Sequence, residues 1–130
     1  MKGVPVGDLA GMLAGMAPLL DARRWSFAVV DGGAPDEAFA IIREDEGTTA
    51  IVPDPAGDFA RITLTVHSAL DGVGLTAAVA GALAERGIAC NVVAGFHHDH
   101  LFVPWERRED ALAALAALST GAAAGDGPLA

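Results

Sequence analysis

The fold is decided by residues 62–104, ITLTVHSALDGVGLTAAVAGALAERGIACNVVAGFHHDHLFVP, in which two hydrophobic periods follow one another. Apolar and polar residues alternate from Ile62 to His67, as in a strand with one buried face. From Val73 the apolar period becomes helical, and Gly87 provides a stop for the helix. Residues 88–96 form a second apolar run and predict another strand. Strand, helix and strand in this order predict a βαβ unit with parallel strands and a right-handed crossover.

The polar cluster at residues 97–100 interrupts the apolar pattern before residues 101–105 resume it, which predicts a hairpin. A last helix is expected over residues 108–118, where three leucines fall in register. Only the Gly/Ala-rich tail then remains as a source for a fourth strand. The order βαββα with an uncertain final strand predicts a ferredoxin-like α+β sandwich. The expected core consists of Ile62, Leu64, Val66, Leu75, Val79, Leu83, Ile88, Val92, Leu101, Val103, Leu112 and Leu115.

The segment before residue 59 predicts one helix and three strands. The helix is expected over residues 8–20, with Asp8 as N-cap and a wide apolar stripe that ends in Leu19 and Leu20. Strands are expected at residues 25–30, 38–43 and 48–52, with a hairpin at Glu44–Gly47 and a linker at Pro53–Asp58. The acidic residues of that hairpin are typical of a solvated turn, since nothing apolar surrounds them to raise a pKa.

The composition excludes several classes of function. The 130 residues are 52% hydrophobic and carry a formal net charge of −9, so the chain can bury a core in one domain or two small halves. There is no cluster of Lys and Arg to neutralise phosphates, since Arg23, Arg24, Arg107 and Arg108 come only as isolated pairs, and this argues against a nucleic-acid surface. Residues 9–20 are too few to span a bilayer. The single cysteine, Cys90, excludes an internal disulfide and fits a small buried strand residue in a reducing compartment, so a cytoplasmic location is the default.

Three phrases of the sequence resemble the ACT domain, and in particular small bacterial ACT-domain proteins. They are REDEGTTAIVP at 43–53, LTVHSALDGVGLTAAVAGALAERGIACNVVAG at 64–95 and FHHDHLFVP at 96–104, in the same order and spacing. Asp71, three residues before Gly74 at a strand-to-helix turn, matches the general ACT pattern. FHHDHLFVP is also similar to a strand pair of the CASTOR arginine sensors, which consist of tandem ACT modules. The resemblance covers about residues 8–119.

The resemblance implies a regulatory module that binds an amino acid, without catalysis and without a cofactor. It also implies two ACT-like halves, an N-terminal one at 1–58 and a C-terminal ACT domain at 59–120, followed by a flexible tail at 121–130. Unpaired sheet edges and apolar helices with few charges predict a homodimer. No nucleic acid or membrane is expected among the partners.

The first candidate site is the turn between the first strand of the βαβ unit and its helix, at His67–Thr76. Glycines there let a ligand approach the backbone, and the start of the helix offers unpaired N–H groups that suit a carboxylate. The alternative is that the glycines only make a tight connection. The residues predicted to bind are Asp71, Gly72, Val73, Gly74, Leu75 and Thr76.

The second candidate site is the polar cluster His97, His98, Asp99 and His100. Strand alternation places His98 and His100 on one face and Asp99 on the other. By resemblance to the CASTOR pattern, Asp99 falls on the acidic position that engages the ligand, while Gly95 and Phe96 fall on the backbone segment that lines it.

Two alternatives to amino-acid binding stay open. His98 and His100 with His67 have the chemistry of a metal site, which would make the chain a small metal-dependent enzyme, although no metal-binding motif supports this. The other alternative is an interaction module that binds no ligand, in which the histidines only cap the sheet edge. A Ser68–His67 dyad is disfavoured because adjacent strand residues point to opposite faces.

Overall fold

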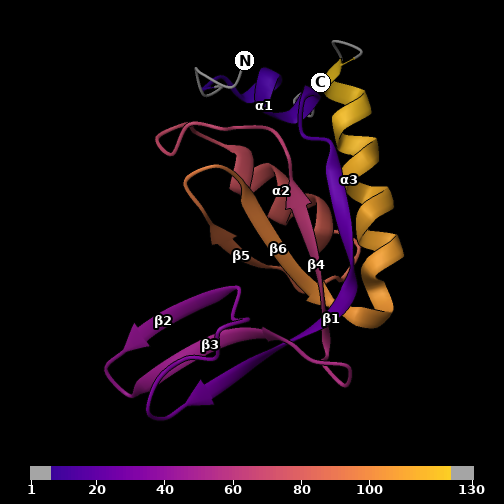
Figure 1. The fold of residues 1–130 in the computed structure, drawn as a ribbon. Coiled ribbons are helices and arrows are strands. Elements are labelled where there is room, and N and C mark those ends of the chain that lie inside the picture. The colour runs from indigo at the N-terminus through magenta and orange to yellow at the C-terminus, as the bar shows by residue number, and fades with distance from the viewer. Residues whose placement is uncertain (1–6, 124–130) are drawn as a thin grey trace.

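The computed structural model describes residues 7–123 as one six-stranded antiparallel sheet with helices packed on one face (Figure 1). A short 3₁₀ turn, Trp105–Arg107, leads into the last helix. None of the helices in this part of the chain is long and apolar enough to cross a membrane. The elements in chain order are α1 Leu9–Ala14, β1 Pro18–Val30, β2 Ala40–Glu44, β3 Gly47–Pro53, β4 Phe59–Leu64, α2 Leu75–Ala84, β5 Asn91–Ala94, β6 Asp99–Pro104 and α3 Arg108–Ala123.

The strand order β2-β3-β1-β4-β6-β5 contains the ferredoxin-like sandwich as its last four strands. β4 and β5 each pair antiparallel with β6, so they run parallel to each other with β6 between them. α2 makes the crossover between these two parallel strands. The predicted βαβ unit and the following hairpin are therefore confirmed, and the fold is α+β of the ferredoxin-like type.

The fourth strand of the sandwich is β1, not the C-terminal tail as the sequence suggested. The first residues of β1 pair antiparallel with β4, with Pro18 opposite Leu64. The first residues of the tail are helical and not a strand, because alanine favours a helix strongly, and α3 continues through residues 121–123. Residues 124–130, the rest of the predicted tail, lie outside the described part of the chain.

The N-terminal helix is much shorter than the predicted 8–20. Asp8 does cap it, accepting a hydrogen bond from the Gly11 amide at 2.8 Å, but α1 ends at Ala14. Ala17 has a left-handed φ of 41°, and Pro18 cannot continue a helix. Leu19 and Leu20 therefore belong to β1, whereas the apolar stripe of the sequence predicted them on the helix.

β1 is long enough to pair with two neighbouring strands along different parts of its length. Its first residues pair with β4, a register shift follows between Leu20 and Arg24, and residues 25–30 pair with β3. The β2–β3 hairpin, with its turn at the expected Glu44–Gly47, extends the sheet beyond the sandwich (Figure 1). Trp25 stands at the junction, opposite both Pro53 and Phe59.

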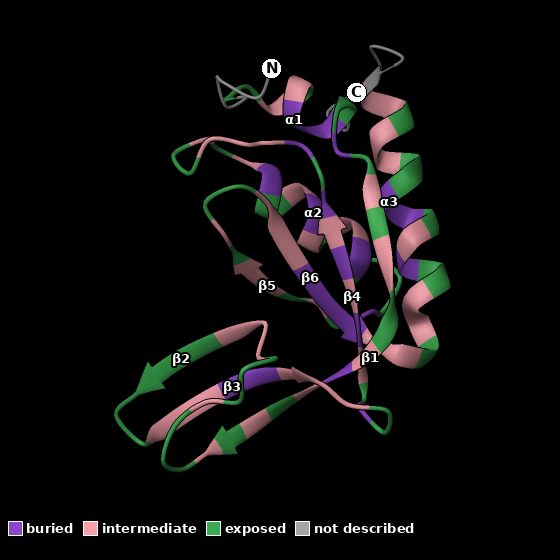
Figure 2. Cartoon of the chain, viewed as in Figure 1, coloured by how far each residue is buried: buried purple, intermediate pink, exposed green. Residues whose placement is uncertain are grey.

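The main core lies between the sheet and the three helices, and Figure 2 shows it as the buried centre of the molecule. Alternate residues of β4 point into it, and α2 contributes the stripe Leu75, Val79 and Leu83. Ten of the twelve predicted core residues are buried, and Val92 and Leu112 pack against the cluster. A smaller cluster of Trp25, Ile51 and Phe102 covers the opposite face of the sheet.

Two strands end earlier than the alternation predicted. β4 stops at Leu64, where the Thr65 amide donates to the Met16 carbonyl in the α1–β1 connection rather than to a neighbouring strand. His67 and Ser68 consequently lie outside the regular strand, so the strand argument used against a dyad does not apply to them. β5 covers only residues 91–94 of the predicted 88–96.

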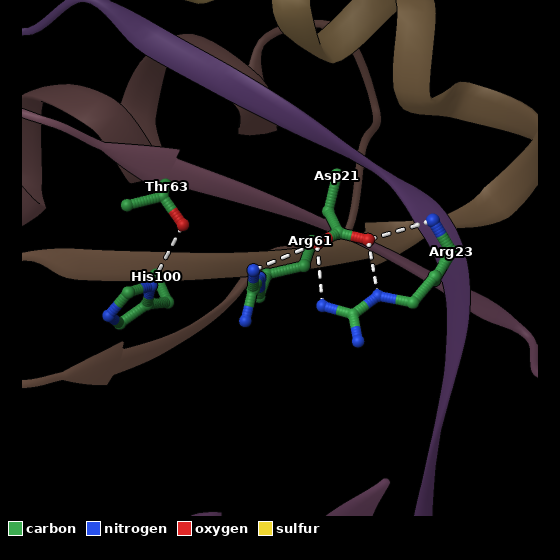
Figure 3. A network of polar contacts seen from close by, with 5 residues as sticks. All are labelled: Asp21, Arg23, Arg61, Thr63 and His100. Atoms are coloured by element: carbon green, nitrogen blue, oxygen red, sulfur yellow. Dashed lines mark hydrogen bonds and ion pairs between the residues drawn. The ribbon is translucent and has the colours of Figure 1, made fainter. Parts of the chain in front are cut away.

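A polar network lies on the sheet face opposite the helices (Figure 3). Asp21 accepts hydrogen bonds from the Arg61 guanidinium at 2.9 Å and the Arg23 guanidinium at 3.0 Å. The side-chain hydrogen bond from Arg23 lowers the pKa of Asp21 from 3.8 to about 2, assisted by the charge of Arg61 and opposed by burial. Thr63 and His100 form a second polar contact at 2.9 Å.

Asp21→Asn is expected to destabilise the protein by about 2 kcal/mol at pH 7, since one pKa unit corresponds to about 1.4 kcal/mol. The pKa of Asp21 is depressed in the folded state, so this stability is present above about pH 4 and is lost as the pH falls toward 2. Urea unfolding of both proteins across this range measures the effect. Asp110→Asn, in an exposed pair with Arg107, is the control and should change stability by less than about 1 kcal/mol. A constant difference between pH 7 and pH 2 would contradict the prediction.

Candidate functional site

A pocket of about 170 Å³ lies where the loop after β4 meets the start of α2 and the beginning of β6. It unites both candidate segments of the sequence, the Gly-rich turn and the polar cluster around Asp99. The residues that line it are Met12, Ser68, Ala69, Leu70, Gly72, Gly74, Leu75, Thr76, Ala77, Ala94 and Asp99.

The start of α2 forms one wall of the pocket. Gly74 is its N-cap with a φ of 103°, a conformation that glycine adopts without the strain a side chain would bring. Having no side chain, Gly74 cannot cap the helix, and the first turn holds no acidic residue. The first-turn N–H groups, for which an α-helix has no internal partner, therefore present a partial positive charge at the pocket.

Asp99 also lines the pocket, at the first position of β6. It shares a strand face with the core residues Leu101 and Val103, which explains why it points toward the helices. Burial raises the pKa of Asp99, and the nearby His98 opposes this shift. Asp99 carries the only charged side chain among the described residues of the lining. The lining of the pocket thus combines a carboxyl group with a partly positive helix start.

Four of the nine predicted site residues do not line the pocket. Val73 and Phe96 are 82% and 68% exposed, and Asp71 is also exposed. Gly95 forms the β5–β6 turn, where its amide donates to the His98 carbonyl at 2.9 Å. The lining contains Gly72, Gly74, Leu75, Thr76 and Asp99 from the prediction.

The sequence did not indicate Met12, Ala77 or Ala94 as lining residues. Met12 reaches the pocket from α1, far away in the chain, and local patterns carry no signal for such a contact. Ala77 and Ala94 have no functional chemistry that would mark them. Ser68, Ala69 and Leu70 lie inside the predicted turn His67–Thr76, although they were not singled out.

The histidines of the polar cluster point to different partners. His98 Nδ1 lies 3.4 Å from the Val66 carbonyl, whereas His100 contacts Thr63 on the open sheet face and the edge of the Phe39 ring. Burial, with the charges of Arg61 and His98, lowers the pKa of His100 to about 4. Within residues 7–123 no three His, Cys, Asp or Glu side chains come together in a group that could hold a metal ion.

Two family models, both described as ACT domain, match this chain at residues 5–68 and 60–117. The second match contains every pocket residue except Met12. A search among curated proteins found no match.

Several solved structures are similar to this one. A protein of unknown function from Vibrio cholerae, described as a possible transport protein, is 42% identical, with a TM-score of 0.70 over 82% of this chain and 92% of that one. A protein from Agrobacterium tumefaciens is 21% identical, with a TM-score of 0.57 over 73% of this chain and 81% of that one. The regulatory subunit of aspartate kinase from Thermus thermophilus is 15% identical, with a TM-score of 0.60 over 78% and 96%.

Proposed function

Since the chain belongs to the ACT-domain family, we propose that it is a regulatory module that binds a small amino acid or a similar zwitterion and catalyses no reaction. The observation that carries the proposal is the pocket whose lining contains both the uncapped start of α2 and Asp99. An amino acid has opposite charges at its two ends, and these two parts of the lining complement them. Its carboxylate would accept from the helix amides and its ammonium would lie near Asp99.

The pocket volume favours a ligand of few atoms. A cavity of about 150 Å³ holds a molecule as small as benzene, whereas the pockets that bind drug-sized ligands measure about 300–1,000 Å³. The present pocket, at about 170 Å³, is near the lower of these sizes. A compact amino acid therefore suits it better than arginine, the ligand of the CASTOR sensors that the sequence resembles.

Thermal unfolding in the presence of each of the twenty amino acids tests the proposal. A ligand at 100 times its dissociation constant stabilises the folded state by about 2.7 kcal/mol, enough for a clear rise in the melting temperature. We expect such a rise for one or a few small amino acids. If isothermal calorimetry also detects no heat with any of them, the chain is better described as an interaction module that binds no ligand.

Asp99→Asn is expected to weaken binding of that amino acid at least tenfold, which corresponds to about 1.4 kcal/mol. The substitution preserves the shape of the side chain and removes its charge. Because Asp99 must be ionised to attract an ammonium group, the affinity of the wild type should also fall as the pH drops through the raised pKa of Asp99. In Asp99→Asn this fall should be absent. Calorimetry at several pH values above the onset of unfolding measures both effects.

His98→Ala separates this proposal from the metal-dependent enzyme. We expect only a small effect on binding, because the His98 imidazole reaches toward the Val66 carbonyl and does not line the pocket. Unchanged binding by Asp99→Asn, with loss of binding by His98→Ala or after treatment with a chelator, would instead support the metal site.

A regulatory role is supported by the likeness of fold to the regulatory subunit of aspartate kinase, and the role itself is our proposal for this chain. Binding without catalysis would also suit the possible transport role of the Vibrio cholerae protein. We place the protein in the cytoplasm, where free amino acids are abundant and where the half-buried Cys90 would stay reduced.

We also propose that residues 1–58 and 59–120 are two ACT-like halves, as the two family matches suggest. The halves are unequal, because the described part of the first has three strands and only the short α1. They share β1, which pairs with strands of both, and therefore should unfold together.

A homodimer is the assembly we propose. β2 and β5 form the two edges of the sheet, and Leu70, Val73 and Phe96 are exposed apolar side chains near the pocket end of the molecule. Light scattering at tens of micromolar should give twice the 13.1 kDa mass of one chain. A monomer at that concentration would remove the idea that a second copy covers the ligand.

A further inference from the structure

Among residues 7–123, Met12 is the one lining residue of the pocket that comes from outside residues 68–99. Its side chain is fully buried, and it meets the Gly-rich turn directly. A Cβ atom added to Gly72 would lie 3.1 Å from Met12 Sδ and 3.2 Å from Met12 Cε. Because none of its surface is exposed, the thioether lies behind Gly72 and forms the floor of the pocket there.

The position of Met12 is fixed by its surroundings. The Met12 amide donates to the Asp8 carbonyl at 3.0 Å in the first turn of α1. The neighbouring Leu13 is fully buried in the main core, and Leu9 of the same helix packs against Gly74, where an added Cβ would lie 3.2 Å from Leu9 Cδ2. α1 thus contacts the Gly-rich turn through both Leu9 and Met12. Met12 therefore has little freedom to move aside for a larger ligand.

We propose that Met12 determines the ligand specificity of this pocket by limiting the length of the ligand side chain. This rests on the proposed function and adds a residue that neither the Gly-rich turn nor Asp99 would suggest. With the carboxylate at the start of α2 and the ammonium near Asp99, the side chain of the ligand is left to the apolar part of the lining, where Met12 stands. An additional methylene group typically changes affinity by about 10- to 200-fold in such a pocket.

The experiment uses calorimetry with a series of L-amino acids that differ by one methylene each: alanine, 2-aminobutyrate, norvaline and norleucine. The wild type should bind one of the shorter members best. Met12→Ala removes three side-chain heavy atoms, so the preferred member should become longer, and norleucine should gain at least tenfold in affinity relative to alanine. Met12→Leu shortens the side chain by one atom with little loss of volume, and it should give a smaller shift in the same direction if Met12→Ala does not fold.

Met16→Ala is the matched control. Met16 is also fully buried in the main core but does not line the pocket, so the same change there should leave the order of the series unaltered. An unaltered order in folded Met12→Ala or Met12→Leu would overturn the role of Met12 and leave the proposed function standing. Absence of binding by the wild type to the series and to the twenty amino acids would overturn both.

Discussion

Leu83→Ala is expected to lower the free energy of unfolding by about 2–5 kcal/mol, and Leu64→Ala by a similar amount. Leu83 is fully buried on α2 and Leu64 is 1% exposed on β4, and both belong to the cluster between the sheet and the helices. Each substitution removes apolar contacts and leaves a cavity that the surrounding residues fill only in part. Urea unfolding followed by circular dichroism gives the two values.

Leu19→Ala is the control for both core variants. Leu19 lies on β1 but is 63% exposed, so its loss should change stability by no more than about 0.5 kcal/mol. A loss below about 1 kcal/mol at both Leu64 and Leu83 would mean that the helix and strand faces assigned to the core are wrong.

Gly57→Ala is the second substitution for which we expect a large effect, about 1–3 kcal/mol or more. Gly57 is buried between β3 and β4, and a Cβ atom there would overlap the carbonyl oxygen of Trp25 and approach the Trp25 nitrogen to 2.8 Å. The Trp25 backbone cannot move aside easily, because it pairs with Pro53 on one side and Phe59 on the other. Urea unfolding, with tryptophan fluorescence as a second probe, tests the prediction.

Gly81→Ala is the control for Gly57→Ala, because the same substitution at Gly81 is expected to raise stability instead of lowering it. Gly81 is exposed within α2, and nothing lies within 4 Å of an added Cβ. Alanine favours a helix over glycine, so this variant should gain about 0.5–1 kcal/mol. If Gly57→Ala were as stable as the wild type, the close approach of the two backbone segments would be wrong.

The sequence predicted the second half of the fold well because its signals there are local. Each of these signals depends on a few neighbouring residues. They are the hydrophobic period, the end of the helix at Gly87 and the polar cluster at residues 97–100. The first half was harder to predict. The stripe from Leu9 to Leu20 matches a helix, yet Ala17 and Pro18 divide it into a helix and a strand. Pairing with β4 then decides the conformation of Leu19 and Leu20, and no local pattern contains that information.

The candidate site was predictable to the extent that its chemistry is visible in the sequence. Gly72 and Gly74 before a helix predict a close approach of the backbone to a ligand, and the resemblance to the CASTOR pattern indicates Asp99. Met12 is an ordinary apolar residue on an apolar stripe, and only the seating of α1 on the turn brings it to the pocket. The resemblance also indicates Gly95 and Phe96, which do not line this pocket, because it gives an order of residues and not their positions around a pocket.

The placement of β1 has a consequence for how the protein is made. During synthesis β1 leaves the ribosome before β4, its partner in the sandwich, and before the crossover helix α2. Until β4 emerges, the nascent chain holds only α1, β1 and the β2–β3 hairpin, and Phe102, which packs against Trp25 in the folded protein, has not yet been made. Folding of the sandwich is therefore a late event that depends on contacts between distant parts of the chain, and such topologies fold slowly. Circular permutation that moves β1 behind α3 would restore the usual ferredoxin-like order and allow the sandwich to form as one continuous stretch.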